Sequence, residues 1–223
     1  MAQRSIARPA HAALADIRDA ERRWDGWNSD AAKAVNALVN VLLQHHAAQQ
    51  PAAWHPSLTF LFPDLPSRFE EANLYLARDT LARLQTTVDK MAQHVSNIGA
   101  AAAKLAGLDS DSGGDASPFV HGTLGMYASL AQATHAVYGQ AMATRMAHIG
   151  ELDATIHAFE STPPAPPPPG ALDSDAQLVK ILAWQDSPGL KDARLDVSDH
   201  ITIITLADFD DLLLLESQAS SAG

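Results

Sequence analysis

Histidines are the residues of this chain that could bind a metal, and the sequence holds ten of them. His45 and His46 are adjacent, so a helix points their side chains about 100° apart. His135, His148 and His157 do not form the i, i+4 pair that places two imidazoles on one metal ion. We therefore read these histidines as solvated or half-buried side chains and expect no metal site.

A second candidate for metal chemistry is the acidic stretch of residues 109–115, whose alternating aspartates resemble a calcium loop. The bidentate glutamate that such a loop needs at its twelfth position is absent, because Val120 stands there. A flexible polar linker is the better interpretation. The sequence also contains no glycine-rich phosphate loop, nucleophile elbow or His-Glu-x-x-His helix, so we expect neither an enzyme nor a cofactor.

Composition narrows the class of protein further. The 223 residues are 47% hydrophobic, which is enough for a packed core, and they include no cysteine. An intracellular, reducing compartment fits this composition. The formal net charge of −11 disfavours direct binding to nucleic acid and favours a basic partner surface. No apolar run is long enough to span a bilayer, so we expect no membrane contact.

The elements that must position any functional residue are predicted to be helices. The strongest signal is a heptad register in which apolar residues alternate at spacings of three and four, which places them along one helical seam. The members of the seam are Leu74, Ala77, Leu81, Leu84, Val88, Met91, Val95, Ile98, Ala102 and Leu105. A seam of this length must pack against another helix.

The residues that flank the seam carry almost no charge, whereas a two-stranded zipper uses flanking charges to pair its chains. This favours an internal three-helix bundle over an obligate parallel dimer. The sequence predicts a central helix over 67–107, opened by a capping box of Ser67 and Glu70. The other two predicted helices run from about 9 to 46, with a kink or a break near Gly26, and from Pro118 to Phe159.

We therefore predict an all-α fold: an elongated three-helix coiled-coil-like bundle with a short C-terminal helical element after a polyproline linker. The predicted boundaries are 1–160 for the bundle, 161–172 for the linker, 173–206 for the helical element and 207–223 for an acidic-hydrophobic tail. The segment from Gln50 to Pro66 is predicted to be a packed loop, with Phe60, Leu61 and Phe62 against the bundle.

Two C-terminal stretches allow alternatives. A helix is our prediction for Leu190 to about Ile204, although residues 201–206 are rich in the β-branched side chains that favour a strand. The tail is predicted to be disordered when alone, and a helix packed back on the bundle is the alternative.

Trp184 lies on a short helix beyond the prolines, where little core is available to cover it, so it is a candidate partner-binding residue.

Three stretches in order resemble the cyclin-dependent kinase 2-interacting protein family. Residues 24–28, Trp-Asp-Gly-Trp-Asn, are similar to its N-terminal region, and residues 79–91 resemble its central coiled coil. Residues 180–184, Lys-Ile-Leu-Ala-Trp, followed by Pro188 and by Arg194-Leu195, resemble its C-terminal element. The chain departs from the family pattern in its polyproline insertion, alanine-rich helices and acidic tail.

The resemblance implies a nuclear adaptor without catalysis, associated with cyclin-dependent kinases, DNA replication and the DNA damage checkpoint. It also implies a place in an AAA ATPase assembly that serves ribosome biogenesis. On this view the chain is a monomer or a subunit of a hetero-complex, and its candidate partner-binding residues are Trp184, Pro188, Arg194 and Leu195. The alternative is a structural coiled-coil subunit of another complex, of the tether or kinetochore type, with the seam as its interface.

Overall fold

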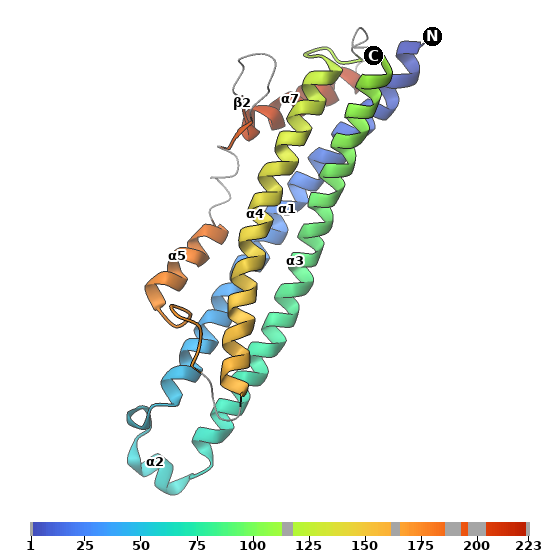
Figure 1. Ribbon diagram of the computed structural model, residues 1–223. Coiled ribbons are helices and arrows are strands. Elements are labelled where there is room, and N and C mark those ends of the chain that lie inside the picture. Colours follow the sequence, from blue (N-terminus) through green and yellow to red (C-terminus); the bar gives the residue numbers. More distant parts are fainter. Residues whose placement is uncertain (1, 113–117, 162–165, 186–192, 196–203, 222–223) are drawn as a thin grey trace. The chain divides into compact units, whose positions relative to one another are not determined.

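The described part of the chain is mainly α-helical, and it includes two strands of two residues each (Figure 1). The structure is a computed structural model that describes residues 2–112, 118–161, 166–185, 193–195 and 204–221. Three helices are long: α1 (Ala2–Ala48), α3 (Leu65–Ser112) and α4 (Leu124–Glu160). The shorter elements are η1 (Pro51–Ala53), α2 (Pro56–Leu61), α5 (Ser174–Gln185), β1 (Arg194–Leu195), β2 (Ile204–Thr205) and α7 (Leu206–Ser221).

Contacts divide the chain into two compact units, and each long helix contributes to both. Unit 1 comprises Met1–Gly26, Lys90–Ala143 and Asp186–Gly223, whereas unit 2 comprises Trp27–Asp89 and Thr144–Gln185. The N-terminal part of α1 therefore belongs to unit 1 and its C-terminal part to unit 2.

In unit 1 the first half of α1 packs on α4, and α4 packs on the second half of α3. The rings of Trp24 and Tyr138 meet edge to face, with 4.9 Å between their centroids. Gly99 of α3 lies directly under the imidazole of His135, where a Cβ would stand 2.8 Å from Nε2. The missing side chain lets α3 and α4 approach closely at this point.

In unit 2 the helices pack through aliphatic side chains that are fully or almost fully buried. These residues include Val35, Leu38 and Leu42 of α1, Leu81 and Leu84 of α3, and Leu152 and Ile156 of α4. On the surface Arg78 of α3 forms ion pairs with Asp153 and Glu160 of α4. Such exposed pairs contribute at most about 1 kcal/mol, so the apolar contacts carry the stability.

The predicted seam is the buried face of α3. Nine of its ten members are buried within this single chain, and Leu74, nearest the start of the helix, is half-buried. The seam therefore supplies core side chains to unit 2 as far as Val88 and to unit 1 from Met91 onward.

Helix ends differ from the prediction. α3 starts at Leu65, so Ser67 lies inside the helix, and it continues through Gly107 to Ser112. Gly107 does not adopt the positive φ of a helix-ending glycine, since Gly170 alone does so among the described residues. α4 starts at Leu124 and not at Pro118, because the Thr123 hydroxyl accepts the backbone N–H of Met126 and serves as its cap.

The prediction of a packed loop over Phe60–Phe62 was wrong. α2 contains no buried residue, and the side chains of Phe60, Leu61 and Phe62 are 85%, 65% and 59% exposed. This short helix is held by its start: Pro56 occupies the first turn and His55 Nδ1 accepts the N–H of Ser57. Local capping therefore fixes α2 without apolar burial.

The C-terminal stretch also differs from the prediction. Arg194 pairs with Thr205 and Leu195 with Ile204 in an antiparallel ladder, so these residues do not form the predicted helix; residues 196–203 lie outside the described part. The β-branched Ile204 and Thr205 favour this extended form. The tail forms α7 instead of remaining disordered, because it buries Leu206, Phe209 and Leu213 in unit 1.

Glu216 ties α7 to the start of α4. Its carboxylate is 1% exposed. Oε2 accepts the N–H of Val120 at 3.2 Å, and Oε1 accepts the N–H of His121 at 2.6 Å and the Tyr127 hydroxyl at 3.1 Å. A buried carboxylate needs such donors, because its charge would otherwise be desolvated without compensation.

We predict that Glu216→Gln destabilises the docked state of α7 by about 1–3 kcal/mol, because the amide NH2 that replaces one carboxylate oxygen is a donor and cannot accept the bond that this oxygen accepts. Amide hydrogen exchange should show a loss of protection in α7 of roughly 5- to 150-fold. Asp211→Asn, on the exposed side of the same helix, is the control and should leave protection unchanged. Equal protection in Glu216→Gln and the wild type would contradict this assignment.

Candidate partner-binding site

α5 has one apolar face toward the protein and another toward solvent. Gln177, Ile181 and Trp184 follow one another at spacings of four and three, and all are at most 6% exposed. The exposed set is Leu178, Val179 and Leu182, at 53%, 67% and 51%. A helix whose two sides are both apolar needs a second partner for the outer side, or leaves that side in water.

The inner face is held by a chain of hydrogen bonds that begins at Trp184. An indole N–H only donates, so Trp184 Nε1 donates to Nδ1 of His148 at 3.0 Å and requires that nitrogen to be unprotonated. The other nitrogen of His148 then carries the proton and donates to Oε1 of Gln177 at 3.0 Å. Gln177 Nε2 in turn donates to the carbonyl of Ala171, also at 3.0 Å.

A second arm joins α1 to the end of α5. Nε of Arg145 donates to Oδ1 of Asn28 at 2.9 Å, and Nδ2 of Asn28 donates to the carbonyl of Trp184 at 2.6 Å. The Arg145 guanidinium lies over the Trp184 ring, with Cζ 5.4 Å from its centroid. Burial lowers the pKa of Arg145 to about 10, which still leaves it charged at neutral pH.

The pKa of His148 is lowered from its ordinary value, mainly because burial disfavours the imidazolium. The positive charge of Lys180 lowers it further, whereas the hydrogen bond to Gln177 and the charge of Glu151 act in the opposite direction. Lys180 itself forms an ion pair with Glu151 at the edge of α5. The lowered pKa therefore favours the neutral form of His148, which is the form that accepts from Trp184 on one nitrogen and donates to Gln177 from the other.

The four predicted partner-binding residues do not form one exposed patch in the described part of the chain. Trp184 is 2% exposed and Leu195 is 0% exposed, so the premise that little core covers Trp184 was wrong. Pro188 lies outside the described residues, and Arg194 is described only as part of β1. Their role in partner binding stays a prediction, and the exposed apolar residues of this region are those on the outer face of α5.

Sequence reasoning missed the residues that bury Trp184. Asn28, Arg145 and His148 lie 156, 39 and 36 positions before it, and no local pattern links them. The outer face was also missed, because the sequence reasoning singled out Trp184 on this helix and did not assign Leu178 and Leu182 to a separate side. Helical spacing is the signal that separates the two faces. Residues 177, 181 and 184 recur at intervals of four and three along one side of the helix, whereas residues 178 and 182 are four apart along another side.

Two observations concern other kinds of site. Among the described residues, no group of three or more histidine, aspartate or glutamate side chains could hold a metal ion. None of the described helices is both long and apolar enough to cross a membrane.

Comparisons with known proteins add no family assignment. No protein-family model matches this sequence, and no curated protein matches it.

We predict that Trp184→Phe loosens α5, because it keeps an aromatic ring but removes the donor to His148 Nδ1. The buried nitrogen then loses its partner, at a cost of about 1–3 kcal/mol. Amide exchange of residues 176–184 measures this loss. Tyr75→Phe, at an exposed position of α3, is the matched control. Unchanged protection in Trp184→Phe would mean that the hydrogen bond contributes nothing to docking.

We also predict that acid releases α5. The pKa of His148 is lower in the docked state than the ordinary 6.5 of an exposed imidazole. The undocked state therefore binds more protons below about pH 6.5. Docking free energy should be constant above this pH and fall as the pH decreases toward the docked pKa. Amide exchange of α5, corrected for intrinsic rates, measures it.

His148→Gln is the control for the pH dependence, because a glutamine retains an acceptor and a donor but does not titrate. His45 and His94 also have lowered pKa values, chiefly because of burial, and they remain in this variant. An equally steep pH dependence of α5 exchange in His148→Gln would therefore assign the effect to other groups.

Proposed function

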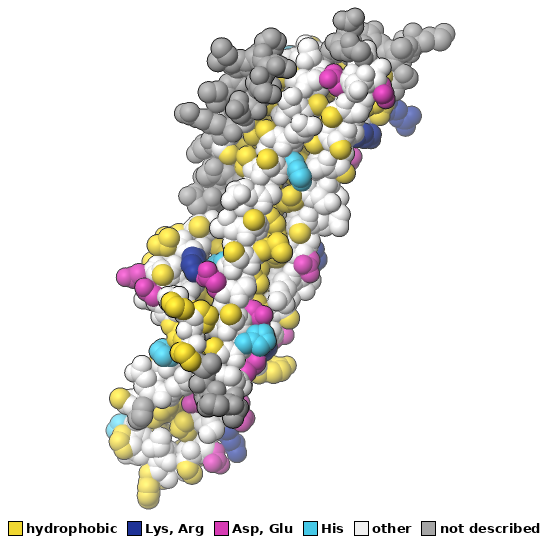
Figure 2. All heavy atoms as spheres, in the orientation of Figure 1, with side chains coloured by type: hydrophobic (Ala, Val, Ile, Leu, Met, Phe, Trp, Pro, Cys, Tyr) yellow, Lys and Arg dark blue, Asp and Glu magenta, His cyan; other side chains and the backbone are white. Residues whose placement is uncertain are grey.

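We propose that this chain is a non-catalytic nuclear adaptor of the kind that its resemblance to the cyclin-dependent kinase 2-interacting protein family implies. The observation that carries the proposal is the outer face of α5, defined as Leu178, Val179 and Leu182. Its three side chains are each more than half exposed. Hydrophobic side chains gather over α5 and over α2 in the space-filling view (Figure 2).

An adaptor must present its contact residues in a fixed arrangement, because ordering a helix during binding consumes part of the binding energy. The hydrogen bonds of Trp184, His148 and Gln177 meet this requirement. They hold the inner face of α5, so its outer face is already helical before a partner arrives. Preorganisation of this kind favours a partner helix that lays its own apolar side along α5.

Charge supports the choice of a basic partner helix. The chain as a whole carries a net charge of −11. Asp175 is exposed near the start of α5, and the positive charge of Lys180 is already paired with Glu151. A partner with lysine or arginine beside its apolar residues would gain in association rate and in specificity.

Coiled-coil-like packing of the three long helices within each unit is part of the proposal. The alternating three and four spacing of the buried seam supports it. The alternative function, a coiled-coil subunit that pairs through the seam, requires those side chains to be accessible to a second chain. Their burial within one chain favours the adaptor, whose partners would be cyclin-dependent kinases, checkpoint proteins and the AAA ATPase assembly.

We predict that Leu178→Gln combined with Leu182→Gln weakens partner binding at least tenfold. Glutamine retains helix propensity, so the substitutions remove apolar contact area without unfolding α5. Titration of the full chain against a purified cyclin-dependent kinase 2–cyclin complex, by calorimetry, measures the dissociation constant.

Tyr75→Gln, which changes an exposed aromatic residue on α3, should bind as the wild type does. Absence of binding by the wild-type chain to this complex and to the AAA ATPase assembly would contradict the adaptor proposal. If the wild-type chain binds and the double variant binds equally well, the outer face of α5 is not the binding surface, and only that part of the proposal is contradicted.

A further inference from the structure

The connection between α1 and α3 carries a cluster of apolar side chains that no other described element covers. We call residues 50–63, which include η1 and α2, the tip of unit 2. Within this unit the tip lies beyond the ends of α1 and α3 (Figure 1). α2 contains no buried residue, and the exposed apolar side chains of the helix and its C-cap are Leu58, Phe60, Leu61 and Phe62. These side chains therefore contribute nothing to the core of the protein.

The exposed side chains surround α2 instead of lying along one side of it. Consecutive helical residues point about 100° apart, so Phe60, Leu61 and Phe62 together span about 200° of the helix circumference. Their exposed fractions are 85%, 65% and 59%. A helix that binds a protein groove lays one apolar side into it, whereas the acyl chains of a lipid layer surround a short segment that enters them. This arrangement favours lipid as the occupant.

The absence of charge at the tip favours the same occupant. No aspartate, glutamate, lysine or arginine occurs from residue 34 to residue 63, although 18% of the chain is charged. His55 is the one titratable side chain of the tip. Its Nδ1 accepts the N–H of Ser57, which requires this nitrogen to be unprotonated and the ring to be neutral. The tip can therefore enter an apolar layer without the desolvation of a charge.

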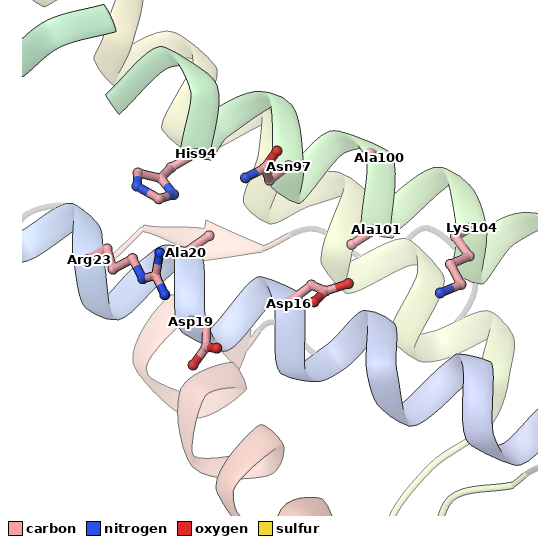
Figure 3. A pocket seen from close by; sticks show the side chains of 9 residues that line it. All are labelled: Asp16, Asp19, Ala20, Arg23, His94, Asn97, Ala100, Ala101 and Lys104. Carbon is pink, nitrogen blue, oxygen red and sulfur yellow. The ribbon is translucent and has the colours of Figure 1, made fainter. Parts of the chain in front are cut away.

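The groove of unit 1 shows the contrast. It lies between α1 and α3 and encloses about 410 Å³ (Figure 3). Its lining combines buried alanines with four charged residues, which are Asp16, Asp19, Arg23 and Lys104. Lipid that entered this groove would desolvate these charges, whereas lipid around the tip of unit 2 would meet none.

The tip also provides acceptors for its own backbone donors. A lipid layer offers no hydrogen-bond partner, so a segment that enters it must satisfy its N–H groups internally. Pro51, Pro56 and Pro63 have no N–H. Phe60 and Leu61 lie inside α2, where N–H groups bond within the helix. The remaining N–H groups of residues 57–62 have acceptors in the tip: Ser57 donates to His55 Nδ1, Leu58 and Thr59 to the His55 carbonyl, and Phe62 to the Leu58 carbonyl.

Trp54 lies where the tip meets the rest of unit 2. It is half-buried, and its ring meets that of Phe69 edge to face, with 5.5 Å between the centroids. Its Nε1 donates to the carbonyl of Ala48 at 2.8 Å. Tryptophan is enriched at the level of lipid headgroups. The exposed Asp64 and Arg68 follow the tip directly and limit the depth to which it enters a lipid layer.

We propose that the tip inserts into the surface of a zwitterionic lipid layer, with Phe60, Leu61 and Phe62 at the boundary between headgroups and acyl chains. The net charge of −11 disfavours an anionic surface, so apolar insertion supplies the affinity. Our expectation of no membrane contact rested on the lack of a spanning run, which surface insertion does not require.

Flotation of the full chain with phosphatidylcholine vesicles tests the proposal. The wild-type chain should float with the vesicles equally at low and at high salt, because screening of charges does not weaken an apolar contact. Phe60→Ser combined with Phe62→Ser should lower the lipid partition coefficient about tenfold or more, since it removes two exposed aromatic rings. α2 contains no buried residue, so this variant keeps the core, which circular dichroism checks.

Leu178→Gln combined with Leu182→Gln is the control, because it removes exposed apolar side chains from α5 and leaves the tip unchanged. This variant should float as the wild type does, so the lipid proposal and the adaptor proposal fail separately. Absence of wild-type flotation, loss of flotation at high salt, or equal flotation of F60S/F62S would each overturn the inference. A wild-type dimer that F60S/F62S abolishes, without flotation of the wild type, would assign the tip to a second copy instead.

A fluorescent label measures insertion directly. The chain has no cysteine, so Leu61→Cys carries a single environment-sensitive dye at the tip. Its emission should shift to shorter wavelength when phosphatidylcholine vesicles are added. The same dye on Asp89→Cys, at an exposed position of α3, should show no shift. A label at residue 61 that shows no shift, or equal shifts at the two positions, would contradict insertion of the tip.

Discussion

The apolar stripe of α3 is the constraint on which the rest of this fold depends. Its side chains recur at spacings of three and four, so one side of a 48-residue helix must be covered along most of its length. No single short element can cover it. In each unit, segments of α1 and α4 cover the stripe. Because the stripe is long, these two helices are long as well. The shorter elements α5 and α7 then add to cores that already exist.

This constraint explains which parts of the fold the sequence could predict. Apolar periodicity identified the three long helices and the seam, because burial of a stripe is encoded every three or four residues. Helix ends were less predictable: Gly107 has the residue type of a terminator, yet the cost of a glycine inside a helix is only about 1 kcal/mol. Packing of the residues around it outweighs that cost, and α3 continues.

The C-terminal region was harder to predict because its structure depends on residues that are distant in the sequence. Leu206, Phe209 and Leu213 form a buried stripe, but in an acidic segment such a stripe predicts either a helix or a disordered binding peptide. The donors that satisfy Glu216 lie about 90 residues earlier. The same holds for Trp184, whose exposure depends on three residues that no local pattern associates with it.

The hydrogen bonds between polar groups in the inner face of α5 also determine where this helix lies. Apolar side chains alone would let a short helix slide or rotate on its neighbours, since their contacts have no direction. Trp184, His148 and Gln177 form bonds whose donors and acceptors match in only one position. That position is what leaves Leu178, Val179 and Leu182 facing solvent. The buried network therefore fixes the position of the outer face, and protonation of His148, which would break the bond from Trp184, is expected to loosen that face as well.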